Sequence, residues 1–362
     1  MQEKLMEICA AFRIQGTFSA WEELKVGNIN KTYKVTFTRD TGFEKAYIVQ
    51  RVNTYVFRHP EQVMENIERV TQHLREWRPG QVNLHFHHTR EGQNFIRDAE
   101  YIWRLFNYVP SAEWADYRDE TLVHNAGLAF GEFQNVLSGF DPSLLHETIP
   151  DFHNTLKRYE ALETAVRQDP AGRLAEVKEE AAWLMQVKDE ACVLCDLQSK
   201  GKLPLRVTHN DTKVNNVLFD KKDKRALVVI DLDTVMPGLA GNDFGDAIRS
   251  IANTAAEDEM DTEKVSCDLQ LFRCFTEGFL AYTAKAFTQT EIDTLGISCF
   301  ALTAELAVRF LTDYLLGDPY FYCAYPEHNL VRTRAQIALA KDMKRKMNEM
   351  NRIVQACAQQ YR

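Results

Sequence analysis

The hydrophobic pattern of this 362-residue chain changes near residue 108, and this change constrains the fold more than any other feature. Before it, apolar and polar residues alternate in short runs bounded by turns, as in 33–37 and 46–51, which is typical of strands. From about residue 121, apolar residues recur at the spacing of helices. The sequence therefore predicts an α+β fold of two lobes: a small antiparallel-sheet N-lobe, residues 1–107, and a large, mainly helical C-lobe, residues 108–362.

Prolines, glycines and polar turns locate the remaining elements. A connector between the lobes is expected near 106–110, where the last strand of the sheet ends. The expected elements beyond the first hairpin are a helix over 60–76, strands over 94–96 and 101–108, helices over 122–137, 151–165 and 174–197, a strand pair of 206–208 with 226–232, and several helices from 264 onward.

Composition and charge limit the class of protein. Apolar residues make up 45% and charged residues 26%, as in ordinary globular proteins, and the net charge of −9 argues against nucleic acid or an anionic membrane as the partner. The sequence has no apolar stretch of the ~20 residues that a membrane span needs, and Glu3, Lys4 and Glu7 interrupt any signal-peptide core. We therefore expect a cytoplasmic protein, a monomer or weak homodimer, that acts on a small molecule.

The eight cysteines do not form a metal-binding pattern. Cys192 and Cys195 stand three residues apart within an expected helix, and the sequence has no second cysteine or histidine pair at zinc spacing. Core-facing thiols in a reducing compartment account for this spacing better than zinc or redox chemistry does.

Residues that could support phosphoryl transfer are concentrated in one polar loop and at the end of the strand that follows it. The reaction needs a carboxylate to deprotonate the attacking hydroxyl, hard oxygen ligands for Mg²⁺, and a cation near the γ-phosphate. Asp211 can be this carboxylate, Lys213 the cation, and Asn216 and Asp231 the metal ligands. A hairpin between 219 and 228 would bring Asp231 back beside Asn216. The simpler alternative is that Asp211 and Asn216 only cap turns.

These two segments together resemble the catalytic motifs of the aminoglycoside phosphotransferase and choline kinase superfamily: His-x-Asp-x-x-x-x-Asn at 209–216 and Ile-Asp-x-Asp at 230–233. The resemblance implies a protein-kinase-like fold, with ATP and Mg²⁺ as cofactors. It also implies that Asp211 is the catalytic base and that Asn216 and Asp231 bind the metal.

Two nearby features are interpreted through the same resemblance. Lys213 matches the lysine of the protein-kinase catalytic loop, which implies a contact with the γ-phosphate. Residues 243–245 spell Asp-Phe-Gly, a kinase metal motif, but Asp231 is the aspartate that ends the strand directly after the catalytic loop. We therefore expect Asp243 and Asp246, at a helix N-terminus, to brace the catalytic loop.

On the nucleotide side, the turn at 27–33 is expected to cover the phosphates with Asn30 and Thr32 as donors, although an ordinary hairpin turn would look the same. The next strand lacks the lysine that pairs with the α- and β-phosphates in kinases. Gln50 and Arg51 stand there on opposite faces. Arg51 is the better electrostatic substitute, unless it faces solvent.

Adenine would need backbone groups from the connector and an apolar floor. Phe106, Tyr108 and Val109 are the expected connector residues, and Leu218 and Ile230 are the expected floor. All five could equally be ordinary core residues.

Further segments resemble the N-acetylhexosamine 1-kinase branch of the superfamily: 27–30, 50–57, 64–67, 208–216, 230–238, 243–249 and 309–315. Together they span almost the whole chain. This resemblance implies that the acceptor is the anomeric hydroxyl of N-acetylglucosamine or N-acetylgalactosamine. It implies that Asp211, Asp233, Arg309, Tyr320 and Phe321 lie at the sugar.

Several alternatives stay open. Asn28 replaces a histidine that touches the sugar in this branch, which leaves the preferred hexose open. Arg309 and Asp313, at i and i+4, could be a pair on a helix surface. The competing functions are a kinase of another small molecule of the superfamily, such as an aminoglycoside, a choline-like base or another sugar, and a nucleotide-binding protein without kinase activity.

Overall fold

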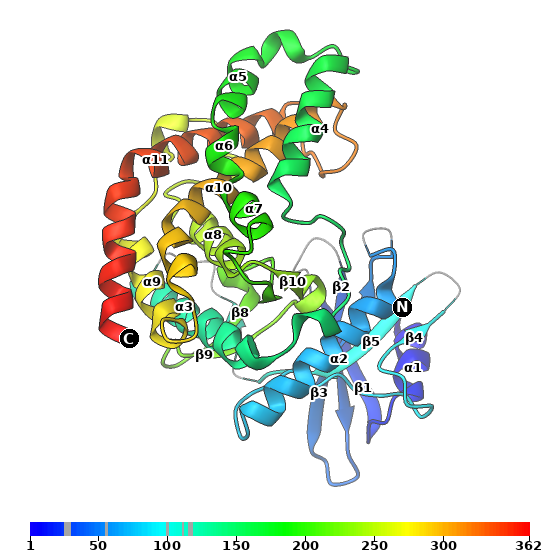
Figure 1. Ribbon diagram of the computed structural model, residues 1–362. Helices are drawn as coiled ribbons and strands as arrows, with labels where there is room; N and C mark the ends of the chain where they lie inside the picture. The colour runs from blue at the N-terminus through cyan, green and yellow to red at the C-terminus, as the bar shows by residue number, and fades with distance from the viewer. Residues whose placement is uncertain (25–29, 55–56, 99–100, 111, 115–118) are drawn as a thin grey trace. The chain divides into compact units, whose positions relative to one another are not determined.

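The computed structural model describes residues 1–24, 30–54, 57–98, 101–110, 112–114 and 119–362, and the chain divides into two compact units (Figure 1). The first unit comprises Met1–Glu113, Ser143–Pro150 and Ile230–Met236, and the second comprises Trp114–Pro142, Asp151–Val229 and Pro237–Arg362. The first unit therefore extends beyond residue 107 and takes in the short segment that carries Asp231. Each unit is described by itself below.

The sheet of the first unit is antiparallel, as predicted from the sequence. Its strand order is β1-β2-β3-β5-β4 within the described residues. The strands are β1 (Thr17–Leu24), β2 (Lys31–Thr38), β3 (Glu44–Val52), β4 (Ile96–Arg97) and β5 (Ile102–Asn107). The sequence did not predict β1, because this edge strand is solvent-exposed along most of its length and so lacks an alternating apolar pattern.

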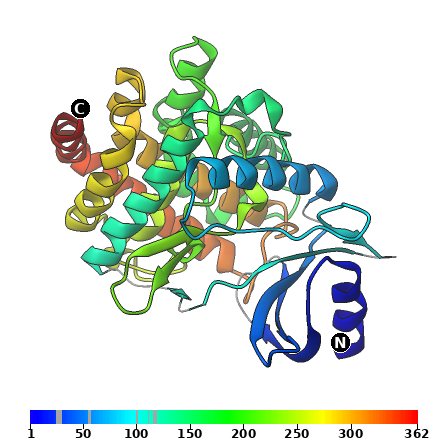
Figure 2. The ribbon, with the colours of Figure 1, turned by 90° about the horizontal axis from the view of Figure 1, so that it is seen from below.

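Alternation along the central strands gives the sheet two different faces. Tyr33, Val49 and Leu105 lie opposite one another on one face and form an apolar cluster with helix α1 (Gln2–Ala11). Figure 2 shows α1, in dark blue beside the N label, lying against the sheet. The other face carries a polar row, described below, that contacts Met64 of helix α2 (Pro60–Trp77).

The second unit is mainly helical, with a small hairpin that precedes the metal motif. Helix α11 runs along α9 and α10 (Figure 1). The helices are α3 (Glu120–Val136), α4 (Thr155–Gln168), α5 (Lys178–Gln186), α6 (Lys188–Ala191), α7 (Val193–Ser199), α8 (Ala240–Ile251), α9 (Leu269–Thr283), α10 (Gln289–Leu315) and α11 (His328–Tyr361). The short strands outside the five-stranded sheet are β6 (Ala112–Trp114), β7 (Arg206–Thr208), β8 (Val217–Asp220), β9 (Ala226–Val229) and β10 (Met236–Gly238).

Two expectations about this unit are wrong. The helix expected over 174–197 is broken into α5, α6 and α7, because single residues with ψ near 0°, Val187 (ψ 5°) and Cys192 (ψ 3°), tighten the chain between them. Strand β9 pairs with β8 rather than with β7, since a five-residue turn returns the chain directly onto β8. The hairpin expected between 219 and 228 is confirmed.

Helix α10 forms the centre of the second unit. Phe300, Ala304 and Val308 belong to a buried cluster shared with α4, α5, α6 and α11. By length and composition α10 could cross a bilayer, but 78% of its most apolar window is buried inside the structure, as in the core helix of a globular protein. The apolar character of α10 is therefore explained by packing.

Candidate active site

Three predicted residues of the catalytic loop lie together in the second unit. Asp211 Oδ1 is 2.8 Å from the Lys213 ammonium, and Asp211 Oδ2 accepts a hydrogen bond of 2.9 Å from the Asn216 amide. The same Asn216 amide group donates to the Asp211 carbonyl oxygen at 2.8 Å. The Asp211 carboxylate raises the pKa of Lys213, since the ammonium is favoured beside a negative charge.

The arrangement of Asn216 fits a metal ligand. Both hydrogens of its side-chain amide are directed at Asp211, which leaves the Asn216 Oδ1 atom as a hard oxygen donor. Asn216 is 7% exposed, whereas Asp211 is half-buried, so the loop offers one fixed amide oxygen and one accessible carboxylate. These are the donor types that Mg²⁺ accepts in phosphotransferases.

Asp243 and Asp246 brace the loop, as expected from their place at the start of α8. Asp243 accepts hydrogen bonds from the backbone N–H groups of His209 (2.8 Å) and Asn210 (2.7 Å). Asp246 accepts one from the backbone N–H of Thr212 (3.0 Å) and is paired with Arg249. Burial raises the pKa of Asp243, although the hydrogen bonds from the loop oppose this shift.

The residue before Asp211 has an unusual backbone conformation. Asn210 has φ = 64°, in the left-handed region that asparagine tolerates better than most residues. Asp243 holds its N–H group, and the ring of His153 lies 3.3 Å from its carbonyl oxygen. The orientation of Asp211 therefore depends on contacts on both sides of Asn210.

The segment Ile230–Met236, which contains the expected metal ligand Asp231, belongs to the first unit. Asp231 is exposed and also left-handed, with φ = 59°, and a single 3₁₀ turn follows it. Asp233 is buried, with 4% of its side chain exposed, and forms an ion pair with Arg104. The Asn30 amide donates a hydrogen bond of 2.6 Å to the other Asp233 oxygen. Thus Asp233, assigned to the substrate by resemblance, has the contacts of a buried counter-ion.

Arg104 is a functional candidate that the sequence analysis missed. Residues Thr32, Gln50 and Arg104 lie directly opposite one another on β2, β3 and β5. Gln50 accepts two hydrogen bonds from the Arg104 guanidinium, at 3.0 and 2.7 Å, and donates one of 3.1 Å to Thr32. A lone cation in the apolar strand 102–106 is the signal that could have identified Arg104.

Arg51 does not take part in this row. It lies on the other side of β3, with its guanidinium 4.1 Å from the centre of the Tyr101 ring. Of the pair Gln50 and Arg51, the structure therefore joins Gln50 to the buried polar network, and the cation of that network is Arg104. Asn28 lies outside the described residues.

The expected adenine residues belong to different parts of the structure. Phe106 is in β5, and its ring packs 4.9 Å from that of Phe86. Tyr108 and Val109 follow β5, with Tyr108 half-buried and Val109 buried. Leu218 is buried in β8 of the second unit, whereas Ile230 begins the metal-motif segment of the first unit.

The expected sugar residues gather at the end of α10. The Arg309 guanidinium lies between two rings, 5.4 Å from the centre of Phe152 and 5.5 Å from that of Phe321. Tyr320 packs edge-on against Phe321, with 64% of its surface exposed. The structure thus brings Arg309, Tyr320 and Phe321 into one group.

Asp313 does not form the helix-surface pair with Arg309 that the sequence left open. It is 3% exposed and accepts hydrogen bonds of 2.9 Å from the backbone N–H groups of Tyr320 and Phe321 and from the Asn329 amide. The alternative that Arg309 and Asp313 form a helix-surface pair is therefore wrong. Asp313 instead fixes the loop that carries the two aromatic residues.

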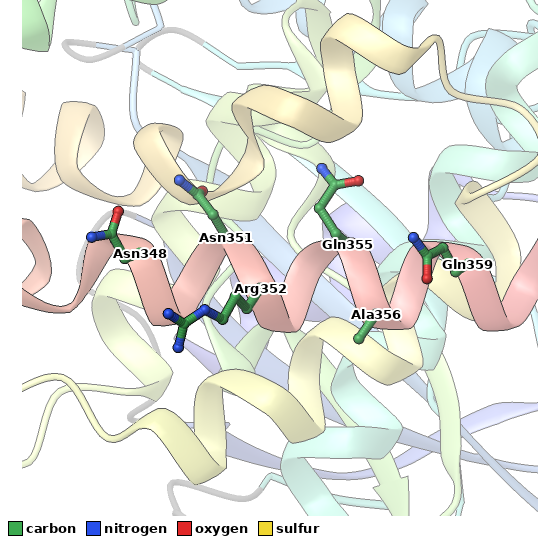
Figure 3. Close-up of a pocket in the computed structure, with 6 residues that line it drawn as sticks. All are labelled: Asn348, Asn351, Arg352, Gln355, Ala356 and Gln359. Atoms are coloured by element: carbon green, nitrogen blue, oxygen red, sulfur yellow. The ribbon is translucent and has the colours of Figure 1, made fainter.

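A surface hollow of about 410 Å³ lies along α11 (Figure 3). It is lined mostly by amides, and Asn351 and Gln355 point to one side of the helix in this view. It contains none of the expected site residues. Its full lining is Asn348, Asn351, Arg352, Gln355, Ala356 and Gln359.

The chain is similar to known phosphotransferases. Residues 20–265 match the phosphotransferase enzyme family, APH. An aminoglycoside phosphotransferase from Alicyclobacillus acidocaldarius has a similar structure, with a TM-score of 0.62 and 13% identity over 97% of this chain and 96% of that one. A microcompartment-associated aminopropanol kinase gives a TM-score of 0.62 and 16% identity over 97% and 99% of the two chains. An amicoumacin kinase in complex with AMP-PNP and Ca²⁺ gives 0.59 and 14% over 93% and 92%.

At these identities the structural neighbours show the fold, which is the predicted kinase-like α+β fold. The family match covers both the sheet and the catalytic loop, because it extends from β1 to beyond α8. The chain therefore belongs to the phosphotransferase enzyme family of small-molecule kinases.

Proposed function

We propose that this protein is an ATP- and Mg²⁺-dependent sugar 1-kinase that phosphorylates the anomeric hydroxyl of N-acetylhexosamines. The observation that carries the acceptor class is the Arg309 guanidinium between Phe152 and Phe321. A guanidinium held against aromatic rings can still donate to two sugar oxygens, and an aromatic side chain beside it suits the apolar face of a pyranose.

The charge around Arg309 favours a neutral acceptor over a polycation. The pKa of Arg158 is lowered, first by burial and then by the positive charge of the nearby Arg309. Two arginines beside the expected acceptor site would repel the ammonium groups of an aminoglycoside or a choline-like base. This argument favours the sugar among the small-molecule acceptors of the family.

Each catalytic residue has one step in the proposed reaction. Asp211 accepts the proton of the anomeric hydroxyl while the hydroxyl oxygen attacks the γ-phosphorus. Lys213 stabilises the negative charge on the transferred group. Asn216 and Asp231 would hold the metal, which neutralises phosphate charge when bound. The bond between the γ-phosphorus and the ADP oxygen breaks, and in such a transfer this oxygen and the attacking oxygen lie on opposite sides of the phosphorus.

An acceptor panel tests the proposal. ADP release would be measured with N-acetylglucosamine, N-acetylgalactosamine, glucose, kanamycin and choline, and the product would be identified by phosphorus NMR. We expect an anomeric 1-phosphate from at least one N-acetylhexosamine. Turnover of kanamycin or choline without turnover of either sugar would contradict the acceptor class but not the kinase. Tight ATP binding without any transfer would instead support a nucleotide-binding protein without activity.

The proposal extends to the setting of the enzyme. We infer a cytoplasmic enzyme of carbohydrate metabolism that works as a monomer or weak homodimer. Sedimentation at micromolar concentration would check the assembly, since a weak dimer dissociates on dilution.

A further inference from the structure

His153 connects the catalytic loop to the central helix of the second unit. Its Nδ1 atom lies 2.9 Å from a carboxylate oxygen of Glu305 on α10, and its Nε2 atom lies 3.3 Å from the carbonyl oxygen of Asn210. The His153 side chain is 9% exposed and that of Glu305 is 2% exposed. Neither residue was among the expected site residues.

The two partners of the His153 ring are both acceptors. A backbone carbonyl oxygen can only accept a hydrogen bond, so Nε2 must carry a hydrogen to bond Asn210. The second Glu305 oxygen accepts a hydrogen bond of 2.6 Å from the Thr155 hydroxyl, and the groups around Glu305 lower its pKa, so Glu305 is an ionised carboxylate that can only accept. Nδ1 must therefore carry a hydrogen as well, and only the imidazolium form has hydrogens on both nitrogens.

The charged groups around the ring favour this form. Burial and the charge of Arg309 lower the pKa of His153. The carboxylates of Glu305 on α10 and Asp246 on α8 raise it by more, so the net shift is upward. Burial would raise the pKa of Glu305, yet His153, Arg309 and the Thr155 hydrogen bond lower it. Both directions agree with a buried imidazolium–carboxylate pair.

We propose that His153 is a positioning residue that must be protonated for catalysis, because its imidazolium holds the Asn210 carbonyl and thereby aims the neighbouring Asp211. Asn210 is left-handed and is held at its N–H by Asp243, so the bond to His153 fixes the other end of the same residue. The proposal rests on the proposed role of Asp211 as the base.

The direction of the pH effect follows from the contact. A histidine with a raised pKa keeps its proton to a higher pH than an exposed histidine, whose pKa is about 6.5. Deprotonation leaves one hydrogen on the ring, and the Glu305 carboxylate holds it on Nδ1. The contact of Nε2 with the Asn210 carbonyl is therefore complete at acidic pH and is lost as the pH rises through the raised pKa of His153. Turnover should decline in that range.

The first experiment is ¹⁵N NMR of the histidine side chains in the intact protein across pH, with His153→Gln used to assign the signal. We expect both nitrogens of His153 to carry protons at neutral pH and the ring to titrate above the exposed histidines. A neutral ring at pH 7 would overturn the proposal. This readout needs no acceptor, so it is independent of whether the sugar assignment is correct.

The second experiment is the pH profile of kcat for three variants with a working acceptor. Glu305→Gln removes the counter-charge and should move the alkaline decline to lower pH. His153→Gln should lower kcat by about 10-fold, the scale of one charge-assisted hydrogen bond, and abolish this decline. His146→Gln is the control, because His146 also pairs with a glutamate, Glu65 at 2.7 Å, but in the first unit. An unchanged profile in both His153→Gln and Glu305→Gln would overturn the proposal.

Discussion

Arg104 and Asp233 form a buried ion pair that joins strand β5 to the segment carrying the expected metal ligand Asp231. They are 129 residues apart in the sequence, and their side chains are 2% and 4% exposed. Asp231, two residues before Asp233, has a left-handed backbone, so this pair fixes the chain beside a residue in an unfavourable conformation. The buried cation that contacts the segment of Asp231 and Asp233 is therefore on β5, whereas the lysine expected from the resemblance to kinases would be on β3.

Removing one partner of this pair should be costly. Arg104→Met leaves Asp233 as a buried, partly unpaired charge, and we expect a loss of about 3–5 kcal/mol in the free energy of unfolding. Arg104→Met combined with Asp233→Leu should recover part of this loss. Chemical denaturation measures both. The control is Arg334→Met, which breaks an ion pair with Glu180 where 48% of the arginine side chain is exposed, and should cost less than about 1 kcal/mol. Equal losses in the two single variants would show that the buried pair has no special role.

The proposed base has a direct test. Asp211→Asn keeps the size of the side chain but cannot accept the hydroxyl proton, so kcat should fall by ~10²–10⁴ while ATP binding persists. Rapid-quench turnover and nucleotide titration would measure the two effects separately. Asp196→Asn, an exposed aspartate on α7, should leave both unchanged. Turnover within a few-fold of wild type would remove Asp211 from the role of base.

Asp231 and Asp243 should behave in opposite ways. Asp231 is exposed, so Asp231→Asn should abolish Mg²⁺-dependent turnover with little change in Tm, because a hard cation loses its anionic ligand. Asp243→Ala should lower Tm, since it leaves the buried N–H groups of His209 and Asn210 without their acceptor, at about 1–3 kcal/mol each. Differential scanning calorimetry and a magnesium titration decide between them. A stable Asp243→Ala protein without Mg²⁺-dependent turnover, together with an active Asp231→Asn protein, would reverse the two assignments.

The parts of the site predicted from sequence are those whose partners are close in the chain. Asp211 and Asn216 contact each other five residues apart, and a hairpin of fixed length leads to Asp231. Arg104 was missed because its partner is distant in sequence, and His153 because its partners, Asn210 and Glu305, follow it 57 and 152 residues later. Local motifs determine local geometry, whereas the counter-ion of a buried charge is known only once the fold is known.

The same reasoning applies to the fold. The period of the apolar residues predicted α2 and β2, because each buries one regular face, and a short apolar run bounded by turns predicted β3, whose centre is buried on both faces. It failed at β1, which exposes both faces at the sheet edge. It also failed between α5 and α7, where the helical period continues through two short breaks at Val187 and Cys192. Periodicity reports which side of a segment is buried and does not report where its hydrogen bonding is interrupted.

Close packing of α3 against α9 predicts a stability effect outside the site. A Cβ atom at Gly278 would overlap the carbonyl oxygen of His124, and one at Gly127 would overlap that of Phe275. Gly278→Ala should therefore lower the free energy of unfolding by about 1–3 kcal/mol through overpacking. Gly139→Ala is the control, since no atom lies within 4 Å of the added Cβ. Denaturation midpoints of the two variants give the comparison, and equal midpoints would contradict the tight helix contact.

The last prediction concerns the acceptor, through the side chain of Arg309. Arg309→Ala should lower kcat/KM for the N-acetylhexosamine by about 10- to 100-fold, because the sugar oxygens lose a bidentate donor. Arg309→Lys should recover little of this, since an ammonium keeps the charge but cannot donate two parallel hydrogen bonds as a guanidinium does. The KM for ATP should stay nearly unchanged in both variants. Lys341→Ala is the control: its ammonium lies 5.3 Å from the Trp183 ring, so it removes a cation stacked on an aromatic side chain elsewhere in the second unit. A rise in the ATP KM with an unaltered sugar KM would instead place Arg309 on the nucleotide side of the reaction.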